Sequence, residues 1–271
     1  MPFHTQLIIT TLSGALTFCL VLGAAGALIQ RSKHSLPPIP VFPGSAFPGI
    51  FTKFYTAFFL ITFTLSAIAE CMQPGVQQLH DEELPGLILS GALQVLLYLP
   101  LIIVYFAQPS QRRERTTLAR KALWCIAGLV VLFIPAVILQ VSGFNDWLIE
   151  TTGCPAQQNV VEYMQHSSLS VKITLAVMAV IIAPITEECC FRGCLYNILR
   201  QYSSPILAAL ASGLLFGAIH TSLAQMVQLT LFGIMQCYAY EKARSLWLPI
   251  ALHMLFNATS VAILFLCPMP Y

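Results

Sequence analysis

Long apolar runs separated by short connections constrain this chain more than any other feature. A helix needs about 20 mainly apolar residues to cross the hydrocarbon core of a bilayer. Runs that approach or exceed that length lie at residues 6–30, 51–69, 86–107, 122–141, 169–199, 205–220, 223–240 and 246–266. Only 9% of the residues are charged, against about 25% in soluble domains, so a water-soluble fold is excluded. We expect an all-α polytopic membrane protein with about eight transmembrane helices.

The basic residues predict how these spans are oriented. Of the 13 Lys and Arg side chains, all but Lys172 fall at alternate connections, and the opposite connections are acidic. Because Lys and Arg collect on the cytoplasmic side of membrane proteins, both termini are expected outside. We expect the plasma membrane rather than the endoplasmic reticulum. The net charge of +2, with no long basic block, excludes nucleic acid as a partner.

We expect a single membrane domain made of two regions. Residues 1–168 would form an N-terminal four-helix membrane region that ends in an outer loop, residues 142–168, carrying a short surface helix. Residues 169–271 would form the catalytic core. No long polar stretch suggests a second folded unit.

Ionisable side chains inside membrane spans are costly unless they are paired or hydrated, so those that remain are functional candidates. The candidates, with one polar companion, are Glu187, Glu188, Arg192, His220, His253 and Asn257. Residues four apart lie on the same helix face, which predicts an ion pair between Glu188 and Arg192. That pair would leave Glu187 free to face a different neighbour.

The same spacing groups the remaining candidates. His253 and Asn257 are four residues apart and would point into one cavity, and Phe216 precedes His220 by four and would hold its imidazole. At 1.5 Å of rise per residue, Glu187 lies about 20 Å from the cytoplasmic end of its helix but His253 only about 10 Å from its own. An offset or tilt of the helices must therefore bring Glu187 and His253 to the same depth in the membrane.

These groups are suited to hydrolysis of an amide bond. A carboxylate beside an imidazole in a water-poor pocket activates water, which fits Glu187 with His220. Fixed donors such as His253 and the Asn257 amide are what a developing oxyanion requires.

Three motifs follow one another in the last third of the chain: E-E-x-x-x-R from Glu187, F-x-x-x-H from Phe216 and H-x-x-x-N from His253. Over residues 169–265 the chain resembles the CPBP family, which groups type II CAAX prenyl endopeptidases with bacteriocin-processing and self-immunity membrane proteins. The resemblance implies an intramembrane endopeptidase acting on a membrane-associated protein or peptide. A prenylated CAAX protein is the best-known substrate of that family.

The resemblance also implies roles for single residues. Glu187 would activate water with the help of His220, while His253 and Asn257 would stabilise the oxyanion. Glu188 and Arg192 would be structural support, as would Phe216 from its spacing.

A metal is one open alternative. Glu187, His220 and His253 would supply three ligands to a zinc ion, with water as the fourth. The chain has no H-E-x-x-H motif and these ligands come from three separate helices, so we favour a reaction without a metal.

Two other functions stay open. A non-catalytic membrane scaffold or bacteriocin self-immunity protein would keep the fold without the chemistry. A proton-coupled transporter would use the buried carboxylates, but the front half has no counterpart to the polar groups of the back half, as inverted repeats would require.

Overall fold

The computed structural model describes Ala57, Ile61 and residues 84–106, 118–152, 167–220, 223–243 and 245–266. Every element within these ranges is a helix, which confirms the all-α fold class. The predicted spans at 6–30 and 51–69 lie outside the described residues, apart from Ala57 and Ile61.

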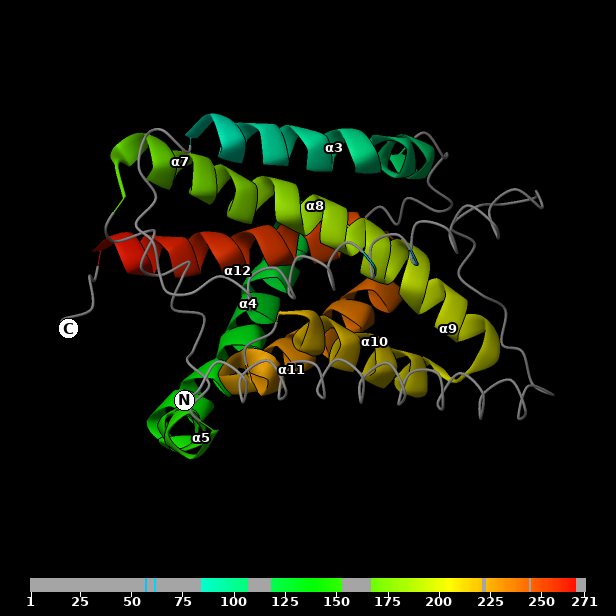
Figure 1. Cartoon of the computed structure of the whole chain (residues 1–271). Coiled ribbons are helices and arrows are strands. Elements are labelled where there is room, and N and C mark those ends of the chain that lie inside the picture. Colours follow the sequence, from blue (N-terminus) through cyan, green and yellow to red (C-terminus); the bar gives the residue numbers. More distant parts are fainter. Residues whose placement is uncertain are drawn as a thin grey trace. The chain divides into compact units, whose positions relative to one another are not determined.

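The bounds of the helices agree with the apolar runs of the sequence. The α-helices shown in Figure 1 are α3 (Leu84–Phe106), α4 (Leu118–Val141), α5 (Phe144–Thr152), α7 (Leu169–Val177), α8 (Ala183–Glu188), α9 (Asn197–Tyr202), α10 (Pro205–Ile219), α11 (Leu223–Ala243) and α12 (Trp247–Leu266). Helix α5 is the short helix expected in the loop at 142–168. Two π-helical segments, η2 (Met178–Ile182) and η3 (Cys189–Tyr196), lie before and after α8.

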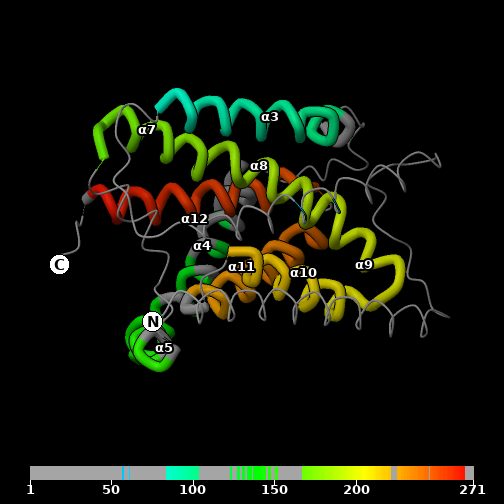
Figure 2. Tube along the Cα trace, viewed as in Figure 1, coloured from blue at the N-terminus to red at the C-terminus, as the bar shows by residue number. Residues whose placement is uncertain are grey.

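The chain divides into two compact units. Unit 1 includes Leu132–Ala156 and Cys190–Arg244; unit 2 includes Gly75–Val131, Gln157–Cys189 and Ser245–Tyr271. In unit 2, α3 runs alongside α7 (Figure 2), and both α3 and α12 contact η2 and α8. The glutamate pair therefore lies on a helix that two other helices of the same unit hold.

Three helices within the described ranges are long and apolar enough to cross a bilayer. They are Leu84–Ile103, Leu169–Tyr202 and Trp247–Phe265. Many of their apolar side chains are exposed, as lipid contact requires. The protein is an integral membrane protein, and the count of eight spans stays a prediction. Helix α10, Pro205–Ile219, is shorter than a full span, as its sequence predicts.

Local sequence explains where the central helices begin. The Oγ atom of Ser168 accepts a hydrogen bond from the Val171 N–H and caps α7. The Oγ atom of Ser204 does the same for the Leu207 N–H, and Pro205 occupies the first turn of α10. A serine cap accepts a hydrogen bond from one of the N–H groups that have no acceptor at the start of a helix. Proline fits in the first turn because it has no backbone N–H that would need an acceptor.

Helices α10 and α11 of unit 1 approach closely through glycines. A Cβ atom on Gly213 would lie 2.7 Å from the Thr230 carbonyl oxygen, and one on Gly217 would lie 2.5 Å from that of Met226. A Cβ on Gly233 would lie 2.8 Å from the Gly213 Cα. Small residues of this kind let membrane helices pack backbone to backbone.

Candidate active site

The glutamate pair is on α8, which follows a break in the regular helical hydrogen bonds. In η2, the Ala183 N–H donates to the Met178 carbonyl, five residues back. The next donor of that ladder would be residue 184, but proline has no N–H. The Ala179 carbonyl instead accepts a hydrogen bond of 2.7 Å from Nδ2 of Asn257 on α12. Asn257 thus fastens α12 to the turn that precedes the glutamates.

His253 lies between the two carboxylates within unit 2. Its Nδ1 atom is 2.9 Å from Oε1 of Glu188, and its Nε2 atom is 4.0 Å from Oε2 of Glu187. All three side chains are buried, with Glu187 8%, Glu188 0% and His253 4% exposed. A carboxylate only accepts hydrogen bonds, so Nδ1 carries the proton and Nε2 faces Glu187.

One carboxylate oxygen of Glu187 has no hydrogen-bond partner among the described residues. Within the part of the chain that the structure describes, its Oε2 atom makes no hydrogen bond, although it is buried. Buried polar atoms almost always have a partner, so one without a protein partner needs an explanation, and a catalytic role is one explanation. This oxygen is where a hydrolytic water would be received.

A polar contact from the N-terminal region reaches α8 as well. Nε2 of Gln94 on α3 donates a hydrogen bond of 3.0 Å to Oγ1 of Thr186, the residue before Glu187. Sequence reasoning missed this residue and the pairing of Glu188 with His253. Spacing along one helix carries no information about partners 92 and 65 positions away, respectively.

In unit 1, His220 caps the end of α10 and is held by Phe216. Its Nδ1 atom is 2.7 Å from the Phe216 carbonyl oxygen, and the two rings lie 4.8 Å apart between centroids. A carbonyl only accepts, so Nδ1 is the protonated nitrogen and Nε2 presents a lone pair in the neutral ring. His220 therefore has the tautomer that a base or a water-orienting group needs.

Arg192 packs on the Phe216 ring as well. Its guanidinium carbon lies 4.8 Å from the centre of the Phe216 ring, and Nη2 donates to the Gly233 carbonyl on α11 at 3.1 Å. The side chain is fully buried. Arg192 thus connects η3, α10 and α11, a contact that suits the supporting role that its sequence position implied.

The expected partners divide between the two units. Unit 2 brings Glu187, Glu188 and His253 together and binds Asn257 to Ala179, while unit 1 holds Arg192, Phe216 and His220 together. The expected pairs Glu187 with His220 and Glu188 with Arg192 join different units, so both stay predictions.

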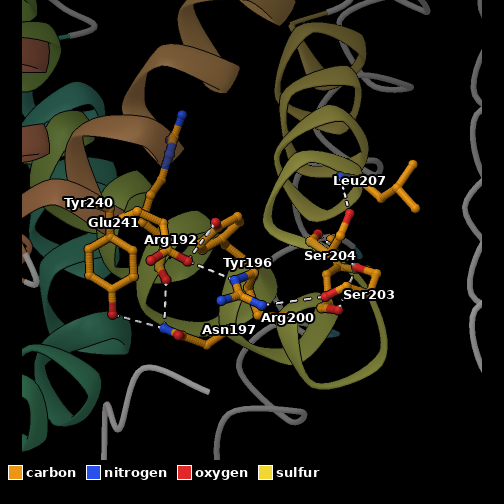
Figure 3. Close-up of polar contacts among 10 residues, drawn as sticks. Arg192, Tyr196, Asn197, Arg200, Ser203, Ser204, Leu207, Tyr240 and Glu241 are labelled. Atoms are coloured by element: carbon orange, nitrogen blue, oxygen red, sulfur yellow. Dashed lines mark hydrogen bonds and ion pairs between the residues drawn. The ribbon is translucent and has the colours of Figure 1, made fainter. Parts of the chain in front are cut away.

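A second polar cluster of unit 1 joins the end of α9 to α11 (Figure 3). Glu241 accepts hydrogen bonds from Nε of Arg200 at 2.7 Å and from the Tyr196 hydroxyl at 2.9 Å. Nδ2 of Asn197 donates to the Arg192 carbonyl and to the Tyr240 hydroxyl, both at 2.9 Å. These bonds satisfy polar groups at the end of η3, where the regular helical ladder is altered.

No group of three or more His, Cys, Asp and Glu side chains within the described ranges has the geometry to hold a metal ion. Within unit 2, Glu187 and His253 supply two of the three expected zinc donors. The proposed zinc set with His220 stays a prediction.

Comparison with known proteins finds a family model that matches the part of the chain with the site residues of both units. Residues 169–259 match the family model for Rce1-like type II CAAX prenyl endopeptidases. This part of the chain is therefore similar to an Rce1-like domain. The site residues of both units and the polar cluster around Glu241 lie within this Rce1-like domain, and Gln94 lies outside it.

Two curated relatives cover more of the chain than the Rce1-like domain does. The "Putative membrane peptidase YdiL" of Bacillus subtilis (strain 168) is 26% identical over 157 residues, which are 57% of this chain and 61% of the relative. The "Uncharacterized 24.3 kDa protein" of Escherichia coli is 28% identical over 147 residues, 52% of this chain and 63% of the relative. The chain thus spans less than two thirds of each relative. No solved structure matches it significantly.

Proposed function

We propose that this protein is an intramembrane endopeptidase that hydrolyses a peptide bond of a membrane-associated protein or peptide. The observation that carries the proposal is His253 buried between two adjacent carboxylates, with the Oε2 atom of Glu187 making no hydrogen bond in the described part of the chain. The Rce1-like domain and the relative described as a membrane peptidase support the same activity.

In the proposed reaction, Glu187 accepts a proton from a water molecule while the water oxygen attacks the scissile carbonyl carbon. The tetrahedral intermediate collapses by breaking the C–N bond, and Glu187 returns the proton to the leaving amine. The products are a carboxylic acid and an amine, and transfer of the acid's proton to the amine then gives a carboxylate and an ammonium group, so the protons balance. His220, through its Nε2 lone pair, would help to orient the water.

His253 and Asn257 would stabilise the oxyanion of the intermediate. His253 already donates from Nδ1 to Glu188, so donation from Nε2 requires the imidazolium form. The Glu188 carboxylate stabilises that cation in the apolar surroundings, as the carboxylate of a hydrolase triad does for its histidine. One Asn257 N–H holds Ala179, and the second N–H of the same amide would be the donor to the oxyanion.

Cleavage of a membrane-embedded peptide library by the purified protein in proteoliposomes tests the proposal. The Glu187→Gln variant should cleave at least about a hundredfold more slowly than the unchanged protein, since a positioned base contributes at least that factor. Glu150→Gln, a matched change of an exposed glutamate on α5, should leave the rate unaltered. Equal rates for the unchanged protein and Glu187→Gln would refute the assignment.

Two further arms of the same experiment test whether the reaction needs a metal and whether the substrate needs a prenyl group. A strong chelator should leave the rate unchanged, and loss of activity under chelation would move the site to a metal. Prenylated and unprenylated forms of the same CAAX-type peptides would show whether a prenyl group is required. Absence of cleavage in every arm would favour a non-catalytic membrane scaffold.

A further inference from the structure

Gln94 is a polar side chain near the middle of a membrane span. It lies ten residues after Leu84, or about 15 Å into α3, where an amide without a partner would be costly. The bond that its amide donates to Thr186 offsets that cost. The contact joins the N-terminal region of the chain to the helix that carries the glutamates.

The face of α3 that carries Gln94 packs against the rest of unit 2. Gly91, Gln94, Tyr98 and Leu101 are three or four residues apart and share one side of the helix. Tyr98 and Leu101 are 4% and 2% exposed. A Cβ atom on Gly91 would lie 3.6 Å from the Ile182 and Met178 side chains, so α3 approaches η2 closely at this point.

Thr186 connects Gln94 to the backbone turn that precedes the glutamates. Its hydroxyl donates to the Ile182 and Ala183 carbonyls, both at 3.0 Å, and accepts from Gln94. Pro184 removes a backbone N–H from this same turn, so backbone hydrogen bonds hold it less firmly than they hold a regular helix. Side chains must therefore fix the direction of α8.

We propose that Gln94 is a positioning residue for Glu187, acting through Thr186; the inference rests on the proposed peptidase function. Three side chains from two other helices hold α8 and the turn before it: Asn257 at Ala179, Gln94 at Thr186 and His253 at Glu188. Gln94 sets the rotation of α8 about its axis and thereby the distance of the Glu187 carboxylate from the scissile bond. A misplacement of about 1 Å costs up to a hundredfold in rate.

If the hydrogen bond between Gln94 and Thr186 only stabilised the fold, its loss would have a different effect on activity. Hydrogen bonds of this kind commonly join membrane helices, and their loss lowers stability without altering the turnover of the molecules that remain folded. Turnover per folded molecule therefore separates a positioning role from general stabilisation.

The test compares Gln94→Met, Thr186→Val, the double variant and Thr186→Ser in the full-length protein. Methionine keeps the length of glutamine without its donor, and serine keeps the hydroxyl. Ser90→Ala is the control on the same helix, because the Ser90 hydroxyl donates within α3, to the Leu87 carbonyl. The readouts are kcat and KM for a cleaved library peptide, and hydrogen exchange of the backbone amides within residues 183–188, apart from Pro184, which has no N–H.

We expect Gln94→Met to lower kcat by about ten- to a hundredfold with KM changed less than about twofold. The double variant should be no slower than the slower single variant, because both remove one interaction. Thr186→Ser should keep most of the activity. Exchange at 183–188 should accelerate in Gln94→Met and stay unchanged in Ser90→Ala.

Wild-type kcat together with wild-type exchange in Gln94→Met would overturn the inference. Reduced thermal stability with unchanged kcat per folded molecule and unchanged exchange at 183–188 would overturn it too, in favour of general stabilisation. If the unchanged protein cleaves nothing, the proposed peptidase function fails separately. The exchange data then decide alone whether Gln94 holds α8.

Discussion

At the scale of single residues, Glu188 shows how far the sequence could assign the site. Its burial inside a span and its place beside Glu187 were readable from the sequence, because ionisable side chains are rare there. Its contact with His253 was not, because that partner is 65 positions away on another helix. The four-residue spacing predicted an ion pair of Glu188 with Arg192 and gave no indication of His253. Spacing finds neighbours within a helix, whereas partners between helices depend on how the helices pack.

We predict that Glu188→Gln lowers the rate of peptide cleavage at least about tenfold, because the same change beside the histidine of a hydrolase triad lowers kcat by up to about 10⁴-fold. The glutamine oxygen can still accept the Nδ1 proton of His253, but the charge that stabilises the imidazolium is gone. Initial rates of the two purified proteins test this, with Glu150→Gln as the matched control. A wild-type rate in Glu188→Gln would show that His253 does not act as a cation.

At the scale of elements, hydropathy predicted the helices well. The runs at 205–220, 223–240 and 246–266 correspond to α10, α11 and α12 with ends shifted by at most three residues. The length of an apolar run predicts a helix in a bilayer, because a single spanning segment can satisfy its backbone hydrogen bonds there only as a helix. Pro184 follows η2 and was readable from the sequence, but η3 has no proline and no other simple sequence mark, so it could not be predicted. The two π segments change the number of residues per turn on either side of α8, which is why α-helical spacing is unreliable from Cys189 to Tyr196.

The glycine contacts between α10 and α11 lead to a stability prediction. Gly217→Ala and Gly213→Ala should each destabilise the protein by about 1–3 kcal/mol, because the added methyl group would meet backbone atoms of α11. Gly86→Ala in α3 is the control, since nothing lies within 4 Å of the place that its added methyl group would take. Thermal unfolding in detergent micelles should show lower midpoints for the first two variants only. Equal midpoints for all three would mean that α10 and α11 separate at no cost.

At the scale of the whole molecule, the charge pattern predicts the orientation in the membrane. Lys and Arg fall at alternate connections, with the largest group at residues 112–121, and acidic residues 81–83 lie at an opposite connection. The front half has fewer described residues than the back half, and its two earliest predicted spans lie outside them, apart from Ala57 and Ile61. Its orientation therefore depends on the sequence.

A short epitope tag inserted at residue 116 should be reached by antibody only after the cytoplasmic side is opened, because Lys and Arg are retained there. The same tag at residue 82 should be reached in intact cells. Tags at the two ends should behave like the tag at 82. The reverse pattern would place residues 112–121 outside and both termini in the cytoplasm, contrary to the prediction.

Pro184 and the π-helical turn before it have a consequence for how this helix tolerates changes in length. A single wide turn holds one residue more than an α-helical turn, so it is equivalent to an insertion that has been absorbed locally. Deleting one residue within 178–182 would restore a regular turn and leave the glutamates facing as before. The same deletion between 184 and 186 would turn them by about 100° away from His253. Chains with a one-residue gap before the glutamate pair can therefore share this geometry, although their numbering differs.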